Sequence, residues 1–322
     1  MKETHVVFGS TGALGSAIVR RLREEGKLVR AVARDTELAA QLLPPSAGIV
    51  HGDLADPKSI MSACSEAAVV YHCVNIRYSE WVKYMPVLTE NILEATRRVG
   101  ARLVFPGNVY GYGPLQSIPA TEGHPQAATS RKGQLRLRLE RMLMDAHRAG
   151  HVPVVIPRFP DLYGPNVTNP LMAPIFRAAL AGKEAGWPGK LDMPHDLVYV
   201  DDAARASVLL AETDFAYGET WHVPGPGPMT GRQFVEMVFQ ASGTAPKVRS
   251  LGRLLFRLFG ILIPDAGEMV EILHLFEQPL VLDGSKFAEA FPSFQYTRHE
   301  DAIRQTVEWF RQQQVPSAAR AR

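Results

Sequence analysis

Cysteine, long apolar runs and an excess of either charge are all scarce in this 322-residue sequence. The two cysteines, Cys64 and Cys73, are too few for a disulfide framework and have no metal-ligand spacing, so we expect a reducing compartment and no metal site. The longest apolar stretch, residues 254–263, is interrupted by Arg257 and Gly260, and no apolar signal segment opens the chain. A net charge of +2 argues against a dedicated nucleic-acid binder. We therefore expect a cytoplasmic protein that binds neither membranes nor nucleic acid.

What the sequence does contain is a glycine-rich turn close to the N-terminus. Three glycines recur at intervals of three after an apolar run, and an amphipathic segment follows them. This order predicts a strand, a tight turn and a helix that together bind a dinucleotide. A side chain in the turn would keep the backbone away from a pyrophosphate, whereas the free N–H groups of the helix attract that anion. The expected contact residues are Gly9, Ser10, Thr11, Gly12, Ala13, Leu14 and Gly15.

Further cofactor contacts are expected at the ends of the next strands. Arg34 ends the predicted strand 28–33, beside the position of the adenosine ribose. A cation there would pair with a 2′-phosphate, so the sequence favours NADP over NAD. The alternative is that Arg34 is a solvated charge and that Asp35 caps the following helix. The positions expected at the adenine and the nicotinamide are Asp53, Leu54, Val74 and Asn75.

Predicted strands and helices alternate through the first half of the chain. Short apolar runs are separated by helical patterns, of which two long ones span about 81–99 and 130–149. This alternation predicts an α/β fold, a Rossmann-type doubly wound parallel sheet followed by a smaller C-terminal α+β lobe. We expect segments 160–166 and 187–195 to be irregular. The predicted strands of the sheet are 5–8, 28–33, 48–54, 67–73, 102–105 and 152–158.

The sequence predicts two structural units and a tail. Residues 1–158, together with about 196–212, are expected to form the dinucleotide-binding domain. Residues 159–195 and 213–314 are expected to form the substrate-binding lobe, and residues 315–322 a disordered tail.

Five short motifs occur in the order and spacing of a known family: Gly9–Gly15, Gly52–Leu54, Val109–Gly111, Arg158–Pro165 and Val198–Asp202. They make the chain resemble the extended short-chain dehydrogenases/reductases of the NAD-dependent epimerase/dehydratase type, over about residues 4–312. The resemblance implies a Rossmann domain, a C-terminal substrate lobe and a cofactor across the strand ends. It also implies a homodimer joined through the helices at about 81–99 and 130–149.

The catalytic residues of that family are not found at their usual positions. In the family a Ser or Thr polarises the substrate oxygen, and a Tyr-x-x-x-Lys pair transfers the proton. Here the Ser/Thr position holds Pro106. Alignment of the helix on Glu140 puts Lys132 in the tyrosine position and Arg136 in the lysine position. Both cations are therefore expected to contact the cofactor.

Three possibilities remain for proton transfer. Lys132 lies beside Arg136, and repulsion from a second cation favours loss of its proton, although it could instead bind a phosphate or ribose. Tyr110 and Tyr112 could act from their loop, although Tyr110 also matches the structural tyrosine of its motif. Asp161 could act as a base or could cap a turn. The expected substrate pocket consists of Arg77, Asn108, Asp161 and His195, of which His195 could instead be a hydrogen-bonded loop residue.

These features predict an NAD(P)-dependent oxidoreductase or epimerase-like enzyme with non-standard proton-transfer residues. Its substrate would be a small molecule with a hydroxyl or carbonyl group, and a nucleotide sugar is one candidate. The absence of the usual catalytic set supports an alternative, a catalytically inactive NAD(P)-binding regulator or scaffold. The polar residues Asn108, Asp161 and His195 favour the enzyme, because a scaffold has little need of them.

Overall fold

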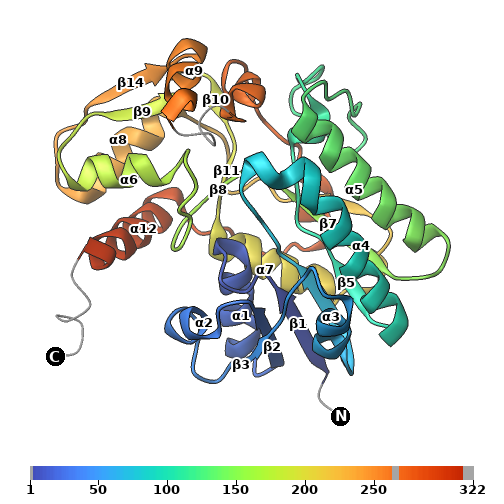
Figure 1. The fold of residues 1–322 in the computed structure, drawn as a ribbon. Helices are drawn as coiled ribbons and strands as arrows, with labels where there is room; N and C mark the ends of the chain where they lie inside the picture. The colour runs from blue at the N-terminus through green and yellow to red at the C-terminus, as the bar shows by residue number, and fades with distance from the viewer. Residues whose placement is uncertain (1–2, 263–267, 315–322) are drawn as a thin grey trace.

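The computed structural model describes residues 3–262 and 268–314, which form two lobes (Figure 1). The predicted tail, 315–322, lies outside the described residues. The N-terminal lobe begins with β1 (Thr4–Phe8), α1 (Ala13–Glu24), β2 (Leu28–Ala33), α2 (Thr36–Leu42), β3 (Gly48–His51), α3 (Pro57–Cys64) and β4 (Ala67–His72). It continues with η1 (Tyr78–Glu80), α4 (Trp81–Val99), β5 (Arg102–Val104), β6 (Gly107–Asn108), η2 (Tyr110–Tyr112), α5 (Arg131–Arg148) and β7 (Val154–Phe159).

The main sheet is parallel and has the strand order β12-β7-β5-β4-β1-β2-β3, with the short β6 also paired to β7; β12 (Thr220–His222) comes from later in the chain. The chain winds outward from β1 to β3, returns to β4 and then continues in the opposite direction. Because such crossovers are right-handed, the helices of the two halves cover opposite faces of the sheet. The direction reverses between β1 and β4, where doubly wound sheets leave a ligand-binding crevice. The predicted doubly wound sheet is confirmed.

Helices cover both faces of this sheet, which explains why its central strands are apolar throughout. On one face α1 packs against α7 (Val200–Ala211), while α3, α4 and α5 pack side by side on the other (Figure 1). Val6, Val7 and Phe8 of β1 are fully buried. A strand buried on both sides reads as a continuous apolar run, and this is the pattern that precedes the glycine turn.

The C-terminal lobe is built from helices and three two-stranded sheets. Its helices α6 (Ala173–Leu180), α8 (Gly231–Ser242) and α12 (His299–Gln314) pack against one another, and each small sheet joins segments that are distant in the sequence. Among the described residues of this part are β8 (Asp161–Tyr163), α6 (Ala173–Leu180), β9 (Ala185–Pro188), β10 (Pro194–His195), β11 (Leu197–Tyr199), η3 (Asp214–Ala216), β13 (Met229–Thr230) and α8 (Gly231–Ser242). The remaining elements are β14 (Val248–Leu251), α9 (Arg253–Leu262), η4 (Met269–Glu271), η5 (Leu273–Phe276), α11 (Ser285–Ala290) and α12 (His299–Gln314).

Three expectations about this region were wrong. Segment 160–166 contains β8, which pairs with β11, and segment 187–195 includes the end of β9 and all of β10, which pair with β14 and β13. These strands have two to four residues and pair with distant segments, so no local periodicity predicts them. Residues from 213 onward were expected to lie in the substrate-binding lobe, but β12 is a strand of the main sheet and pairs with β7.

The predicted long helices at about 81–99 and 130–149 are confirmed as α4 and α5, and local caps fix several helix ends. α3 has Asp56 as its N-cap and a proline in its first turn, and α5 has Ser130 as its N-cap, whose side chain accepts from the backbone N–H of Gly133. α4 ends at Gly100, with φ +71°. In the described parts of the chain, none of the helices combines the length and apolar character that crossing a membrane requires.

Candidate functional site

The glycine turn packs backbone against backbone at the centre of the sheet. Gly9 has φ +73°, and a Cβ added to it would lie 2.4 Å from the carbonyl oxygen of Cys73. A Cβ on Gly15 would lie 2.2 Å from the carbonyl oxygen of Gly9. Any side chain at either position would separate β1 from β4 or α1 from the turn. Gly9 and Gly15 therefore have a structural role.

Gly12 has a different role, at the N-cap of α1. Its φ of −74° is accessible to any residue, and an added Cβ would come no closer than 3.3 Å to the carbonyl oxygen of Gly9. No side chain caps α1, so the N–H groups of its first turn lack a side-chain acceptor at the point where Gly12, Ala13 and Leu14 line the cleft. An anion at this point would accept from those groups. The site thus fits the pyrophosphate of a dinucleotide.

A cleft of about 930 Å³ extends from the glycine turn to the C-terminal lobe. Three predicted cofactor residues lie outside its wall: Gly15, Lys132, and Ser10, whose hydroxyl donates to the Val32 carbonyl oxygen at 2.9 Å. The predicted cofactor residues on its wall are Gly9, Thr11, Gly12, Ala13, Leu14, Arg34, Asp53, Leu54, Val74, Asn75 and Arg136. The predicted substrate residues on its wall are Arg77, Asn108 and Asp161.

Arg34 lines the cleft as an exposed side chain beyond β2. No acidic group within residues 3–262 and 268–314 forms an ion pair with it, so its guanidinium is available to a ligand. Its neighbour Asp35 caps α2, where its side chain accepts from the backbone N–H of Leu38 at 2.9 Å. Asp35 therefore has the capping role that the sequence offered for it.

Asn166 connects the C-terminal lobe to the glycine turn. Its side-chain nitrogen Nδ2 donates to the carbonyl oxygen of Thr11 at 3.0 Å and to Oγ of Ser16 at 3.2 Å. Its backbone has φ +62°, a left-handed conformation that asparagine adopts more readily than most residues. Asn166 also lines the cleft.

Tyr112 lies in a buried polar network and not on the cleft wall. Its hydroxyl is 2.5 Å from Nε2 of His222 and 2.5 Å from Nη1 of Arg158, and Arg158 also pairs with Glu140. Burial lowers the pKa of His222 to about 3, so the ring is neutral at pH 7. Tyr112 is 1% exposed. The structure does not bring this predicted catalytic residue to the cleft, because positions two apart in a 3₁₀ turn point to different sides.

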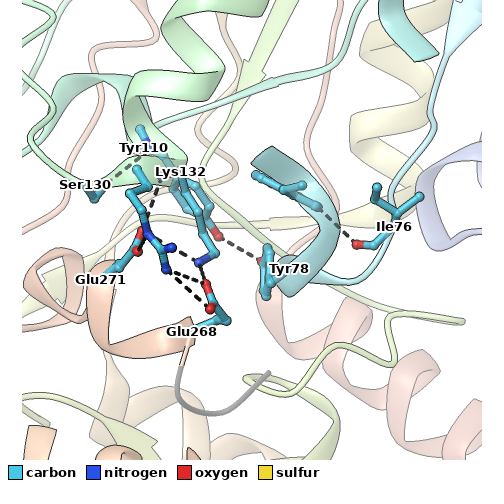
Figure 2. A network of polar contacts seen from close by, with 10 residues as sticks. Ile76, Tyr78, Tyr110, Ser130, Lys132, Glu268 and Glu271 are labelled. Atoms are coloured by element: carbon cyan, nitrogen blue, oxygen red, sulfur yellow. Dashed lines mark hydrogen bonds and ion pairs between the residues drawn. The ribbon is translucent and has the colours of Figure 1, made fainter. Parts of the chain in front are cut away.

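Lys132 is also kept out of the cleft. Its ammonium forms an ion pair with Glu268 and lies 3.7 Å from Oε2 of Glu271, while Arg131 pairs with the same two carboxylates (Figure 2). Lys132 is 1% exposed and is absent from the cleft wall. The two glutamates come from η4 and the residue before it, more than a hundred positions along the chain. No local pattern could have predicted that they cover the lysine.

Asp161 is held at the cleft by His195. Nε2 of His195 lies 2.9 Å from Oδ2 of Asp161, and the imidazole stacks on Phe276 with 4.7 Å between ring centres. His195 is 2% exposed and does not line the cleft, contrary to the prediction. It lies behind Asp161 because β10 pairs with β13 within the lobe. The imidazole thus positions the carboxylate and leaves its other oxygen available to a ligand.

Arg136, in the family's lysine position, lines the cleft. Nη2 donates to the carbonyl oxygen of Pro106 at 2.7 Å, and the guanidinium lies 4.5 Å from the ring centre of Phe105. Its buried Nε has no hydrogen-bond partner among the residues the structure describes. A buried donor without a partner is costly, and an acceptor atom of a bound ribose or phosphate would satisfy it. Arg136 therefore fits the predicted contact with the cofactor.

Two tyrosines of the cleft wall come close together, of which Tyr78 had no catalytic role in the sequence-based prediction and Tyr110 matched a structural tyrosine. Tyr78, in η1, and Tyr110, in η2, have hydroxyl oxygens 3.0 Å apart (Figure 2). Their segments are far apart in the sequence and meet because β4 and β5 are neighbours in the sheet. The available sequence signal was that Tyr78 follows closely after Val74 and Asn75, which were expected near the nicotinamide.

The chain is similar to reductases and to sugar-nucleotide enzymes. It is 26% identical over 277 residues to a 3-diazoavenalumate denitrifying reductase from a Streptomyces species, a match that covers 79% of this chain and 86% of that protein. It is 27% identical over 267 residues to a 2-alkyl-3-oxoalkanoate reductase from Stenotrophomonas maltophilia (strain K279a), with 76% of each covered. The solved structure of a dTDP-glucose 4,6-dehydratase from Bacillus anthracis in complex with NAD superposes with a TM-score of 0.79 and 17% identity, over 97% of each chain.

A family model matches residues 5–223, a range that contains the glycine turn and nearly all of the main sheet. That range also includes the cleft residues Arg136 and Asp161. By this match, the chain belongs to the NAD dependent epimerase/dehydratase family.

Proposed function

We propose that the protein is an NAD(P)-dependent oxidoreductase that acts on a small substrate with a carbonyl or hydroxyl group. The observation that carries this proposal is that one cleft contains both the uncapped N-terminus of α1 and the polar groups of Asn108, Arg136 and Asp161. The nicotinamide supplies or accepts the hydride. The similarity to two reductases supports reduction of a carbonyl as the reaction. It also favours an enzyme over an inactive scaffold.

The residues opposite the glycine turn provide the substrate contacts of this proposal. Asp161, oriented by His195, accepts a hydrogen bond from a substrate hydroxyl group. Asn108 uses its Oδ1 to accept from the backbone N–H of Tyr110 at 3.1 Å, which turns its amide nitrogen toward other acceptors. Arg77 is exposed on the cleft wall and can pair with an anionic part of the substrate.

The direct test is to incubate the purified protein with NADPH or NADH and a set of carbonyl compounds, while absorbance at the nicotinamide band is followed. The set includes a 2-alkyl-3-oxo ester and an aromatic aldehyde, since the relatives include reductases. UDP-glucose, which carries hydroxyl groups and no carbonyl group on its sugar, is tested separately with NADP or NAD as hydride acceptor. Oxidation of the cofactor that depends on the carbonyl supports the proposal. Tight cofactor binding together with no turnover of any compound would contradict it and favour the scaffold.

Arg34 sets a preference for NADP in this proposal. Exchange of Arg34 for Asp replaces a cation by an anion at the 2′-phosphate, and charge-assisted hydrogen bonds contribute about 1.5–3 kcal/mol, so NADPH should bind roughly 10–100-fold more weakly. Affinity for NADH should stay the same or improve. Calorimetric titration with both cofactors measures the ratio of the Kd for NADPH to the Kd for NADH. Arg298→Asp, which makes the same exchange at an exposed site in the other lobe, is the control, and equal ratios in all three proteins would refute the role of Arg34.

We also propose a homodimer through α4 and α5. The two helices pack side by side, and Val82, Tyr84 and Val87 of α4 are 40–53% exposed. Apolar side chains grouped on one exposed helix are typical of an interface. A monomer mass in sedimentation equilibrium at micromolar concentration would contradict the dimer.

A further inference from the structure

The family transfers its proton through a tyrosine on the helix that is α5 in this chain, and α5 has no tyrosine. Lys132 occupies that position and is fixed in ion pairs, while Arg136 occupies the position of the partner lysine. If the protein reduces a carbonyl, another group in the cleft must supply the proton. The cleft wall offers the phenols of Tyr78 and Tyr110 and the carboxylate of Asp161 for this step.

Tyr78 lies next to the site that the missing tyrosine would occupy. The ammonium of Lys132 is 5.7 Å from the centre of the Tyr78 ring, so the residue in the tyrosine position and this phenol are neighbours (Figure 2). The hydroxyl of Tyr78 also lies 3.0 Å from that of Tyr110. A phenol from η1 therefore reaches the region that the family fills from α5.

The loop that bears Tyr78 is held by Trp81. The indole N–H donates to Oδ1 of Asn75 and to the carbonyl oxygen of Ile76, both at 3.0 Å, and the indole ring packs edge-on against Tyr78 with 4.9 Å between ring centres. Trp81 itself is 5% exposed. A buried anchor of this kind fixes the direction of the phenol, which proton transfer requires.

The two phenols differ in burial, and this assigns their roles. Tyr110 is 6% exposed, and burial raises its pKa well above the usual value, so it stays protonated and can donate a hydrogen bond to Tyr78. Tyr78 is only half-buried and is open to the cleft. Arg136 lies within electrostatic range of both phenols, and a guanidinium stabilises a phenolate that forms there.

We propose that Tyr78 is the proton-transfer residue of the enzyme and that Tyr110 and Arg136 position it and stabilise its phenolate, in place of the family's tyrosine and lysine. This assignment rests on the proposed function. In the direction of reduction, the carbonyl carbon gains a hydride from NAD(P)H, and the C=O π electrons pass to the carbonyl oxygen. That oxygen takes the proton from the Tyr78 hydroxyl, and the Tyr78 phenolate then regains a proton from water. The substrate is reduced to an alcohol and the cofactor is oxidised.

The test compares Tyr78→Phe with the unmodified protein, using NADPH and the carbonyl compound that is turned over fastest. Because general acid catalysis typically contributes about 10²–10⁴-fold, kcat should fall at least 100-fold. KM should change less than about threefold, and calorimetry should show an unchanged Kd for NADPH, since the phenol does not hold the cofactor. Tyr110→Phe should lower kcat more mildly, again without an effect on KM. Tyr217→Phe, at a half-buried phenol that donates to the carbonyl oxygen of Ala211 away from the cleft, should leave all three constants unchanged.

Three results would overturn the assignment. If Tyr78→Phe retains a third or more of kcat while Asp161→Asn loses activity 100-fold, the carboxylate transfers the proton and the proposed function stands. If Tyr78→Phe weakens NADPH binding as much as it lowers kcat, Tyr78 is a cofactor contact. If the unmodified protein turns over no carbonyl compound, the proposed function fails and the assignment fails with it. A thermal midpoint for Tyr78→Phe close to that of the unmodified protein confirms that the variant is folded.

Discussion

Gly12→Val is expected to weaken the binding of NADPH at least 100-fold while leaving the protein folded. The valine side chain would stand at the N-cap of α1, between the first-turn N–H groups and the pyrophosphate. Each hydrogen bond to a charged group is worth about 1.5–3 kcal/mol, so the loss of two corresponds to roughly 10²-fold or more in Kd. Folding is expected to survive, because the φ of Gly12 suits any residue and the nearest atom to an added Cβ is 3.3 Å away.

The measurement is calorimetric titration with NADPH, together with thermal unfolding. Gly123→Val is the matched control, since it adds the same side chain where an added Cβ has only Thr121 within 4 Å, at 3.8 Å. A Kd for Gly12→Val within about fivefold of the unmodified protein would mean that the pyrophosphate does not lie on α1. Gly9 and Gly15 cannot serve this test, because side chains there collide with backbone atoms and would disturb folding.

Glu140→Gln is expected to lower the free energy of unfolding by about 3–5 kcal/mol, which is the usual cost of removing one partner from a buried ion pair. Glu140 and Arg158 are 6% and 3% exposed and form such a pair. The same carboxylate also acts electrostatically on Arg136. Burial lowers the pKa of Arg136, and the negative charge of Glu140 opposes this shift. The amide keeps the shape of the side chain but leaves two buried guanidinium groups without a counter-charge.

Urea unfolding followed by circular dichroism measures this effect. Asp145→Asn, on the same helix, makes the same change from acid to amide at a side chain that is 60% exposed and paired with Arg148. Surface ion pairs are worth at most about 1 kcal/mol, so the control should shift the midpoint only slightly. A loss below about 1 kcal/mol for Glu140→Gln would show that water or rearrangement screens the two arginines.

The sequence predicted those parts of the fold that rest on local signals. The helical patterns at about 81–99 and 130–149 predicted α4 and α5 to within a residue at each end. The glycine spacing predicted the turn after β1. The strands of two to four residues in the C-terminal lobe escaped prediction, because pairing with distant segments, not residue preference, forms them.

The same difference between local signals and distant contacts explains which residues of the candidate site could be predicted. Arg34 could be predicted because its place follows from the end of β2, and the structure puts it on the cleft wall. Lys132 could not be judged from its helix alone, since Glu268 and Glu271 cover it from another lobe. The pairing of Tyr78 with Tyr110 likewise depends on the neighbourhood of β4 and β5.

Asn166 has a consequence for the order of events during a reaction cycle. Its amide joins the backbone of the glycine turn to a loop of the other lobe, so we expect a shift of the turn to move that loop as well. Binding of the cofactor to the turn would then change the position of the loop on the opposite wall of the cleft before the substrate binds. We expect a compulsory kinetic order with cofactor first, which product-inhibition patterns would reveal and which Asn166→Ala should convert to random order.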